Sequence, residues 1–452
     1  MDVQVVFRLS PRFEVDKIKD YKVLNAPRPR TFDLVETRTR RPAANCTLSI
    51  STNNLAQRRR LRLGSKAGAA MGTDLSGLQN LRRTFHKFPE LGFEEKQTKA
   101  RVAEDLRRYG LEVHEGVGVV GILKAGSGNR AIGLRADLDA LPISEASTHD
   151  YVSQRPGVMH ACGHDGHTAM LLGAAQALSA DLGFSGTVVF IFQPNEELGL
   201  GAQAMMAEGV LDRFPIEEVY AIHNLPGAPV GQVSTRNGLI CSSESLFEIS
   251  ITGQGGHASM PQAGRDAITV GAEIVQALQT IVARKLAPGA GAVVSVTEFT
   301  TDGQRNVLPG QATLKGDARA RNSEDRDSIE AYMRQLVSGI ADAHGVRADV
   351  TFKTEFVETI NSPIPTEAVI RVAATAGLET LPDRQPMSFS EDFAHFSAAV
   401  PGCFVLLGNG ETGPYGRPLH SNNYDFNDLL LPIGTKFWTE LVRDRLPPQG
   451  RD

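Results

Sequence analysis

The stretch MHACGHDGHTA, residues 159–169, groups three histidines, one cysteine and one aspartate around two glycines. Imidazole, thiolate and carboxylate groups hold zinc and similar divalent ions in proteins. The same groups also occur in redox sites and in polar loops that bind nothing. Only partners from other segments of the chain distinguish these alternatives.

Candidate partners accompany short apolar runs that predict buried strands. They are Asp137 after AIGLRA, Glu196 and Glu197 after TVVFIFQPN, His223 after EEVYAI, and His420 in LHSNNYDF, which follows CFVLLGNG. Functional groups of α/β sheets gather beyond the carboxyl ends of the strands, so we expect these side chains to lie together. One strand-end histidine is usually a hydrogen-bonding group, and one glutamate pair is usually a solvated turn. Their joint occurrence at several strand ends favours a metal centre.

The number and types of these ligands predict two divalent ions per chain, with zinc, manganese, cobalt and nickel as the candidates. About five protein ligands exceed the three that an open catalytic zinc uses, and paired ions share a ligand and a bridging water. The adjacent Glu196 and Glu197 can divide two tasks. One carboxylate binds metal while its neighbour takes the proton from the bound water.

The elements that must position these residues form an alternating α/β pattern. Apolar periodicity and capping signals predict helices over residues 74–87 and 94–110, and a further helix that begins in HDGHTAMLLGAAQAL. The apolar runs predict buried strands between the helices. The sequence therefore predicts an α/β sheet with helices on its faces.

Residues 240–358 show a different order of elements. The predicted series is strand SLFEISITG, a helix over 265–285, strands GAVVSVTEFT and QATLKGDARA, a helix over 323–345, and strand ADVTFKTEF. This β-α-β-β-α-β order is that of a split βαβ, ferredoxin-like unit, which can fold as a separate small α+β domain. The α/β pattern resumes after NSPIPT. We therefore expect a first domain in two parts, residues 71–239 and 359–452, with the smaller domain inserted between them.

The first 70 residues carry 15 Lys and Arg against 6 Asp and Glu, whereas the whole chain has a net charge of −5. The acidic residues argue against a targeting peptide. Weak periodicity predicts a disordered basic extension, with a natural start at Met71 as one explanation. A basic arm for nucleic acid is the less favoured interpretation.

The overall composition, with 41% hydrophobic and 22% charged residues, is typical of a soluble globular protein. It lacks the basic excess of a dedicated nucleic-acid binder, and no uncharged apolar run approaches the roughly 18 residues of a membrane helix. Four scattered cysteines do not make a disulfide framework and favour a reducing compartment, so we expect a cytoplasmic protein. We expect three of them to be small buried hydrophobes: Cys46, Cys241 and Cys403.

Seven motifs, in order, resemble those of the aminoacylase and carboxypeptidase family of metallohydrolases. They are RADLDALP, MHACGHDGHTA, QPNEELG, AIHNLP, GQGGHASMP, NVLPG and LHSNNYDF. The loop that contains Cys162 is similar to that of the amidohydrolase branch, which includes hippurate hydrolase and auxin-conjugate hydrolases. The resemblance covers about residues 74–445. It implies a metallopeptidase-type catalytic domain, with helices on both faces of a mixed sheet, and an inserted lid domain that also serves dimerisation.

The resemblance also implies a role for each candidate. The residues that match the family's metal ligands are Cys162, His164, Glu197, His223 and His420. Cys162 stands where many relatives have a bridging aspartate. Glu196 matches the general base, and Asp137 matches the acid that orients the metal site.

Three residues of the inserted unit match substrate-binding groups. His257 in GQGGHASMP matches the lid histidine that polarises the scissile carbonyl, although its glycine-rich setting also fits a turn histidine. Asn306 in NVLPG and Arg319 in GDARAR match positions that hold the carboxylate of the substrate. GDARARN departs from the GTVRT-like stretch of the branch, so the resemblance supports Arg319 less well.

Other polar residues near these motifs have less direct roles. We expect Asp165 to cap the helix that follows it. His160 and His167 fit supporting roles better than metal ligation, and Glu391 and Asp392 in SFSEDF are expected to order the loop near His420.

The predicted function is hydrolysis of an N-acyl amino acid, or a similar amide, to a carboxylate and a free amine. A metallo-exopeptidase with the same centre is the alternative. A silent binding or scaffolding protein would need a broken site, whereas no ligand or base is missing from the motifs. The expected partners are a small-molecule substrate, no nucleic acid, no membrane, and further copies of the chain in a homodimer or homotetramer.

Overall fold

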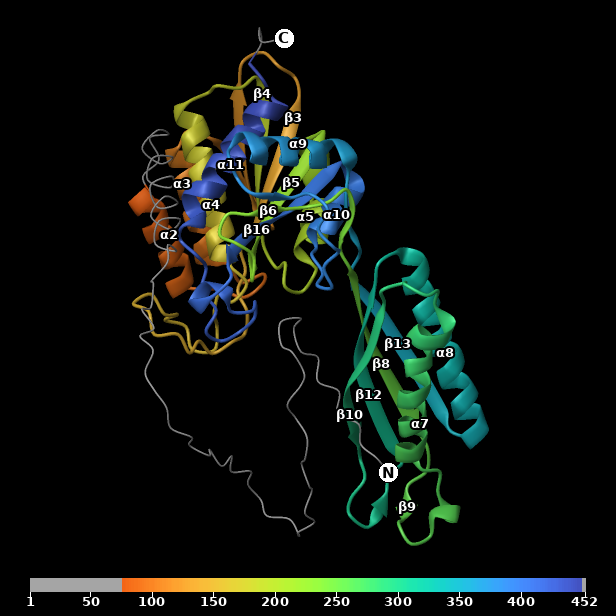
Figure 1. Ribbon diagram of the computed structural model, residues 1–452. Helices are drawn as coiled ribbons and strands as arrows, with labels where there is room; N and C mark the ends of the chain where they lie inside the picture. The colour runs from red at the N-terminus through yellow and green to blue at the C-terminus, as the bar shows by residue number, and fades with distance from the viewer. Residues whose placement is uncertain (1–74, 449–452) are drawn as a thin grey trace, which may run out of the picture. The chain divides into compact units, whose positions relative to one another are not determined.

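The computed structural model describes residues 75–448 (Figure 1). The basic extension predicted at residues 1–70, the start at Met71 and Cys46 lie outside this range. Within it the strands form an eight-stranded sheet, a four-stranded sheet and two two-stranded sheets.

Ten α-helices lie in the described range. They are α2 Leu75–Lys87, α3 Lys96–Arg108, α4 His164–Ala180, α5 Gly201–Ala207, α6 Val210–Arg213, α7 Ala267–Thr280, α8 Ser323–His344, α9 Pro363–Thr375, α10 Phe393–Ala399 and α11 Leu430–Arg445. Two short 3₁₀ turns and one π-helical turn accompany them: η1 Pro261–Ala263, η3 Gly413–Gly416 and η2 Ile281–Lys285.

Sixteen strands lie in the same range. They are β1 Glu112–Glu115, β2 Val119–Ala125, β3 Ala131–Asp137, β4 Gly186–Gln193, β5 Glu218–Pro226, β6 Val233–Ser234, β7 Gly238–Cys241, β8 Ser243–Thr252, β9 Gly256–His257, β10 Val293–Thr301, β11 Val307–Leu308, β12 Gln311–Ala320, β13 Arg347–Phe356, β14 Thr359–Asn361, β15 Thr380–Leu381 and β16 Gly402–Gly410.

The large sheet has the order β1-β2-β4-β3-β5-β16-β6-β15. Its central strands β4, β3, β5 and β16 run parallel to their neighbours in this series, and β2 joins β4 antiparallel. The sheet is therefore mixed, as predicted. Because the four central strands point the same way, their carboxyl ends lie at one edge, where the chemistry of such sheets collects.

The period-two alternation of the strands builds two separate cores. On β4, Phe190 and Phe192 pack into a buried cluster with α2, α3, α4, α9 and α11. Val189 and Ile191 point the other way, into a cluster with α5, α6 and α10. Helices therefore cover both faces of the sheet, which confirms the predicted fold class.

The smaller unit is the four-stranded antiparallel sheet β10-β12-β8-β13, with α7 and α8 packed on it (Figure 1). On β8, Phe247, Ile249 and Ile251 face the helices, while Leu246 on the opposite face is exposed. The order β8-α7-β10-β12-α8-β13 is the predicted split βαβ arrangement. This unit has its own hydrophobic core, distinct from the two cores of the large sheet.

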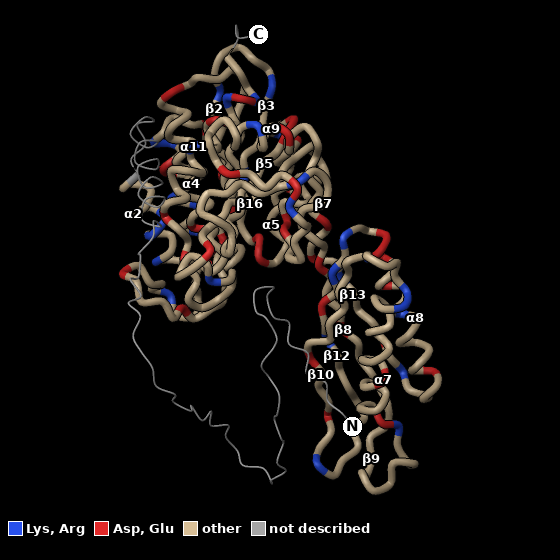
Figure 2. The backbone as a smooth tube through the Cα atoms, viewed as in Figure 1, with Lys and Arg blue, Asp and Glu red and all other residues tan. Residues whose placement is uncertain are grey.

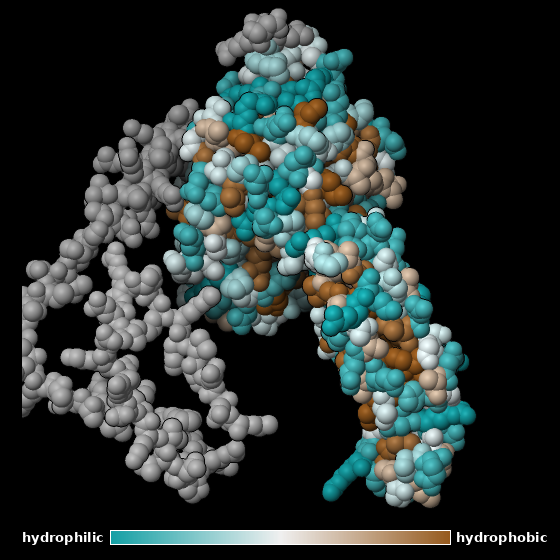
Figure 3. Space-filling model, turned by 45° about the vertical axis from the view of Figure 1, so that its right-hand side comes forward, coloured by the Kyte–Doolittle hydropathy of each residue, from teal (hydrophilic) through white to brown (hydrophobic). Residues whose placement is uncertain are grey.

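Charged and hydrophobic residues are interspersed on the surface of the described residues. Figure 2 shows basic and acidic residues mixed along the backbone of both units. Figure 3 shows hydrophobic residues among hydrophilic ones on the side of the molecule that it displays. Within residues 75–448, no helix is long and apolar enough to cross a membrane.

Candidate metal centre

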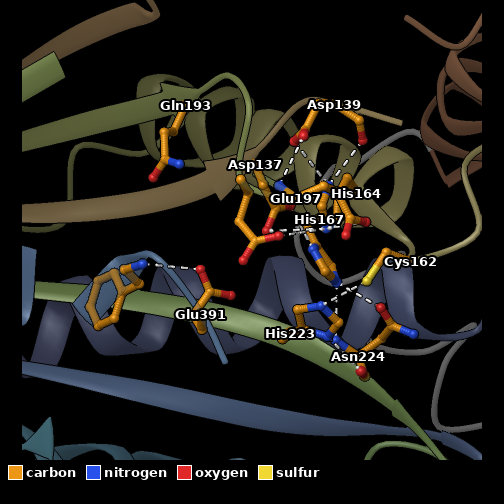
Figure 4. Close-up of polar contacts among 12 residues, drawn as sticks. Asp137, Asp139, Cys162, His164, His167, Gln193, Glu197, His223, Asn224 and Glu391 are labelled. Atoms are coloured by element: carbon orange, nitrogen blue, oxygen red, sulfur yellow. Dashed lines mark hydrogen bonds and ion pairs between the residues drawn. The ribbon is translucent and has the colours of Figure 1, made fainter. Parts of the chain in front are cut away.

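Four segments bring the predicted ligands together at the carboxyl edge of the large sheet: the N-terminus of α4, the loop after β4, the strand β5 and the loop after β16. Figure 4 shows four of these ligands: Cys162, His164, Glu197 and His223. The ligand atoms form overlapping groups, and within each group they lie within 4.8 Å of one another. These groups are Cys162–His164–His223, His164–Glu196–Glu197 and Cys162–Glu197–His420. All five predicted ligands and the adjacent Glu196 thus belong to one cluster.

Gly163 allows Cys162 and His164 to enter the cluster together. It has a φ of +99° and caps the N-terminus of α4. A Cβ atom at this position would lie 2.2 Å from Oδ1 of Asn224, so both the backbone conformation and the space require glycine. The turn places the thiol immediately before the helix and the imidazole at its first residue.

Backbone carbonyls fix the orientation of two imidazoles. The Nδ1 atom of His164 donates to the carbonyl of Asp139 at 2.9 Å, and that of His223 donates to the carbonyl of Asn224 at 2.7 Å. Each hydrogen bond makes Nδ1 the donor and leaves Nε2 as the acceptor, which is how metal-binding histidines are usually held. Nε2 of His164 is buried and has no hydrogen-bond partner.

Several distances in the cluster suit a shared metal ion. Cys162 Sγ lies 3.3 Å from His223 Nε2, and His420 Nε2 lies 3.3 Å from Glu197 Oε2. Ligands at zinc-like bond lengths stand roughly 3.3–3.6 Å apart in a tetrahedron. Oε1 of Glu197 is buried without a hydrogen-bond partner and lies 3.9 Å from His164 Nε2. Unpaired buried atoms are costly unless a ligand satisfies them, so the donor set fits a bound cation.

Backbone strain occurs at two positions beside the cluster. His420 has a φ of +63° and Asn195, just before Glu196, has a φ of +50°. Residues other than glycine rarely adopt this conformation, and such strain concentrates at functional sites. The backbone N–H of His420 donates to the carbonyl of Ala161 at 2.8 Å, and that of Asn195 donates to Glu95 at 2.8 Å. These bonds hold the two strained residues in place.

The carboxylates repel one another where no cation lies between them. Burial raises the pKa of Glu197 to about 8, and the charge of Asp139 adds to this effect. Burial, Glu391 and Glu197 raise the pKa of Glu196 well above its usual range. Burial and the two glutamates likewise raise the pKa of the Cys162 thiol. The cluster therefore favours an added positive charge, which a divalent ion supplies.

The nearby carboxylates also change the pKa of His164. Burial lowers its pKa, but Asp137 and Asp139 outweigh burial and raise it to about 10. His223 is different, because burial and the neighbouring His167 hold its pKa well below the usual value. Its imidazole is therefore neutral, which is the form that binds metal.

Arg135 forms a buried hub behind the cluster. Its guanidinium donates to Asp137 at 2.8 Å, Glu391 at 2.9 Å and Asp392 at 2.8 Å, and its Nε donates to Gln193 at 2.9 Å. Asp137 also accepts from Nδ1 of His167 at 2.7 Å. Asp137 is thus held from two sides, with its Oδ2 3.7 Å from Nε2 of His164.

A pocket of about 270 Å³ opens onto the cluster. Its lining residues are Cys162, Glu196, Glu197, His223, Glu244, Arg319, Phe356, Phe389, Ser390, Leu419 and His420. Apolar groups on its walls and a polar cluster at its base are typical of a site for a small molecule.

A model described as peptidase family M20/M25/M40 matches residues 133–444, which is more than half of the chain. The chain belongs to this family. The match covers all of the cluster described above, so the resemblance seen in the motifs is confirmed.

Relatives within the M20 family differ in their named substrates. The chain is 36% identical over 379 residues to a hippurate hydrolase of Campylobacter jejuni, covering 82% of this chain and 97% of that protein. It is 35% identical over 364 residues to thermostable carboxypeptidase 1 of Saccharolobus solfataricus, covering 78% and 91%. A solved structure described as a dinuclear metal-binding M20 peptidase of Bacillus subtilis has a TM-score of 0.71 at 31% identity, covering 82% of this chain and 98% of that one.

The predicted substrate-binding residues of this M20 chain lie on the smaller unit, and only one of them reaches the pocket. His257 lies on β9, which pairs with β11, and its ring nitrogen Nδ1 contacts Ser259 at 2.8 Å. The carbonyl of Asn306 accepts from the backbone of Ala258 at 3.1 Å. Neither residue lines the pocket, whereas Arg319 does.

One of the minor expectations is wrong. Asp165 does not cap α4, because its carboxylate instead accepts from His86 at 2.9 Å and pairs with Arg82 at 3.5 Å. The carboxylates of Glu391 and Asp392 bind Arg135, and the neighbouring Phe389 and Ser390 line the pocket with His420. That the two acids order the loop near His420 stays a prediction.

The motifs also contained residues that were not singled out. Asp139 orients His164 through its carbonyl and accepts from the backbone N–H of Glu197 at 3.1 Å through its carboxylate. Arg135 organises three carboxylates. Asp139 and Arg135 both lie in RADLDALP, at the end of an apolar stretch that predicts a buried strand. Charged residues in such a stretch are unusual, and this feature of the sequence could have identified them.

Proposed function

We propose that the chain is a metal-dependent amidohydrolase that cleaves the amide bond of N-acyl amino acids of the hippurate type. The main observation is the pair of buried, unpartnered ligand atoms, His164 Nε2 and Glu197 Oε1, beside a second carboxylate, Glu196. A silent binding protein would not need this arrangement. The likeness to a hippurate hydrolase supports the substrate class.

Five residues would hold two divalent ions: Cys162, His164, Glu197, His223 and His420. We propose zinc, manganese, cobalt or nickel, since thiolate, imidazole and carboxylate suit these ions. When bound, the ions lower the pKa of a coordinated water and polarise the amide carbonyl. The description of the Bacillus subtilis relative as a dinuclear metal-binding peptidase supports the number of ions.

Glu196 is the proposed general base. Its Oε2 lies 3.9 Å from Nε2 of His164, and its carboxylate lines the pocket. It takes a proton from the attacking water, whose oxygen bonds to the acyl carbon. The amide C–N bond then breaks, and Glu196 returns the proton to the departing amine nitrogen.

Asp137 is the proposed positioning residue of this site. It receives hydrogen bonds from Arg135 and His167 and lies close to His164. These hydrogen bonds hold the Asp137 carboxylate and the His164 ring in fixed orientations. Residues that contact the ligands of other metal sites act in the same way.

The smaller unit, residues 240–358, is the proposed lid, which presents His257 and Asn306 to the substrate. His257 would stabilise the negative charge that develops on the carbonyl oxygen, from the same chain or from a partner copy. Arg319 lines the pocket and would bind the substrate carboxylate, although it already donates to Asp317 at 2.9 Å and to Ser390 at 2.9 Å and pairs with Glu244. The edge strands β10 and β13 suit pairing between copies in a homodimer or homotetramer, which size-exclusion chromatography with light scattering tests.

The alternative is a metallo-exopeptidase, favoured by the likeness to a carboxypeptidase. A panel of N-acetyl and N-benzoyl amino acids, dipeptides and N-blocked dipeptides separates the two functions. We expect kcat/KM to be highest for the N-acyl amino acids. Cleavage confined to peptides would assign the exopeptidase function.

A further inference from the structure

A second group of metal-type ligands lies outside the cluster that Cys162 and His164 belong to. His86 comes from α2, and Glu145 and His149 come from the loop between β3 and α4. One ligand atom from each lies within 4.8 Å of the other two. No step of the proposed hydrolysis uses these residues.

His86 has the geometry of a metal-binding histidine. Its Nδ1 donates to Asp165 at 2.9 Å, which leaves Nε2 on the opposite side of the ring, 3.2 Å from Oε1 of Glu145. A carboxylate behind the ring fixes its tautomer and makes Nε2 a stronger ligand. The ring is fully buried, so this orientation is well fixed.

His149 approaches the same carboxylate oxygen from another side. Its Nε2 also lies 3.2 Å from Oε1 of Glu145, yet neither of its ring nitrogens makes an aligned hydrogen bond. The ring stacks on Tyr151, with centroids 3.8 Å apart and planes at 15°. The two separations of 3.2 Å are close to the roughly 3.3 Å edge of a tetrahedron with zinc-like bond lengths.

An independent observation comes from His160, which is 1% exposed. Both of its ring nitrogens are buried without a hydrogen-bond partner. Its ring centroid lies 6.4 Å from that of His86. A buried imidazole without partners is unusual, and a neighbouring metal ion provides a reason for it.

The charged residues around His86, Glu145 and His149 are compatible with a bound cation. Arg82 and Arg83 lie nearby, stacked over the Tyr151 ring at 4.6 and 4.4 Å, but both arginines pair with Asp428. Arg82 also pairs with Asp165 at 3.5 Å and with Asp425 at 3.4 Å. Among these acids of the described residues, Glu145 alone has no arginine or lysine partner, since its ion pairs are with His86 and His149.

A proton competes with metal for His86. Burial lowers its pKa, but the hydrogen bonds with Asp165 and Glu145 raise it to about 9. A protonated hydrogen-bond network is therefore the rival explanation, and metal affinity should increase with pH.

We propose that His86, Glu145 and His149, with His160 as the candidate fourth ligand, form a separate mononuclear site for a zinc-like divalent ion. The ion would tie α2 to the loop that leads into MHACGHDGHTA. Three histidines and one carboxylate suit zinc, cobalt or nickel. A site that is closed by protein ligands has a structural rather than a catalytic role.

The test compares zinc content between the full-length chain and its His149→Leu variant. Each protein is stripped with chelator, dialysed against zinc near pH 9 and analysed by atomic emission. We expect the variant to bind one zinc ion fewer per chain and to gain less in Tm on zinc addition. Equal zinc content in the two proteins would overturn the proposal. The difference does not depend on how many ions the proposed catalytic centre holds, so this test is independent of the proposed function.

A matched control and a direct measurement complete the test. His114 is also paired with a glutamate, Glu112 at 2.8 Å, but has no second histidine beside it, so His114→Leu should retain the wild-type zinc content. Should His149→Leu fail to fold, crystals of the unaltered chain grown with zinc decide the matter. An anomalous difference peak between His86, Glu145 and His149 supports the site, and its absence, with peaks elsewhere, contradicts it.

Discussion

The Nε2 atom of His420 lies 3.3 Å from Oε2 of Glu197, although the whole smaller unit, residues 240–358, separates the two residues in the sequence. β16 carries His420 to the same sheet edge at which β4 delivers Glu197, because both strands belong to the parallel centre of the sheet. Glu197 thereby contacts His420 on one oxygen and faces His164 on the other. Glu197 therefore belongs both to the ligand group of His164 and to that of His420.

Changing Glu196 should remove turnover without removing metal. In Glu196→Gln the amide keeps the shape of the side chain but cannot accept the proton, so kcat should fall by roughly 10²–10⁴-fold. Metal content and Tm should stay close to those of the unaltered chain. Glu217→Gln, at an exposed glutamate paired with Arg130, is the control and should keep full activity. Normal turnover by Glu196→Gln would contradict the assignment.

Changing Glu197 should remove metal. Glu197→Gln replaces a charged ligand at the point where the groups of His164 and His420 meet, so metal should be lost together with activity. The expected result is a lower metal-to-protein ratio after dialysis. Full metal occupancy in this variant would exclude Glu197 as a ligand and would suggest that the two glutamates exchange roles.

Asp137→Asn should act through the metal site. The amide cannot match both the Arg135 guanidinium and the His167 N–H as the carboxylate does. We expect metal affinity to fall by about 10–100-fold, as for other outer-sphere changes. Competition with a coloured chelator measures this, and excess metal should partly restore activity. Loss of activity at unchanged metal affinity would point to a direct catalytic role.

Arg319 should affect substrate binding more than turnover. In Arg319→Ala we expect KM for N-acyl amino acids to rise by roughly tenfold or more, since a charge-assisted hydrogen bond is lost. For an N-acyl amino acid amide, which lacks the carboxylate, the KM of the variant should equal that of the unaltered chain. Arg321→Ala, at the exposed arginine next along the chain from β12, is the matched control. A uniform loss of kcat with all substrates would instead indicate a structural role.

Glu218 should stabilise the fold in a pH-dependent way. Burial raises the pKa of this carboxyl, but hydrogen bonds from Arg445 and Tyr220 outweigh burial and lower it. A lowered pKa stabilises the fold above the unfolded value of about 4.3 and loses that effect as pH falls through the folded value. Glu218→Gln should therefore unfold about 1 kcal/mol more easily at pH 7, with a smaller difference from the unaltered chain near pH 3. A difference that is independent of pH would contradict the ionic contribution.

The elements of the fold were largely predictable because their patterns are strong. The runs around Phe190 and Val405 are apolar and of strand length, and α8 is both amphipathic and capped by Asn322. The short strand β1 and the helices α9 and α10 were not predicted. Tertiary packing rather than a local pattern determines β1 and α10, since α10 is only seven residues long and β1 is only half-buried. The helix α9 is as long as α2, but it begins at Pro363 within NSPIPT, a stretch that resembles a turn.

The ligands were easier to predict than the residues that hold them. Ligand-type residues such as Cys162 and His223 stand out at strand and helix ends. Asp139 acts partly through its backbone carbonyl, and Asp165 turns toward His86 instead of its own helix, which no local pattern reveals. Such contacts depend on which elements become neighbours, so they follow from the three-dimensional fold.

We propose that this chain uses bound metal to hydrolyse N-acyl amino acids. The most direct measurement is release of free amino acid from N-benzoyl and N-acetyl amino acids by the full chain, before chelation, after chelation and after divalent metal is restored. We expect chelation to abolish this release and restored metal to recover it, with two ions per chain bound at the centre that contains Cys162. Release that is unaffected by removal of all metal would contradict it.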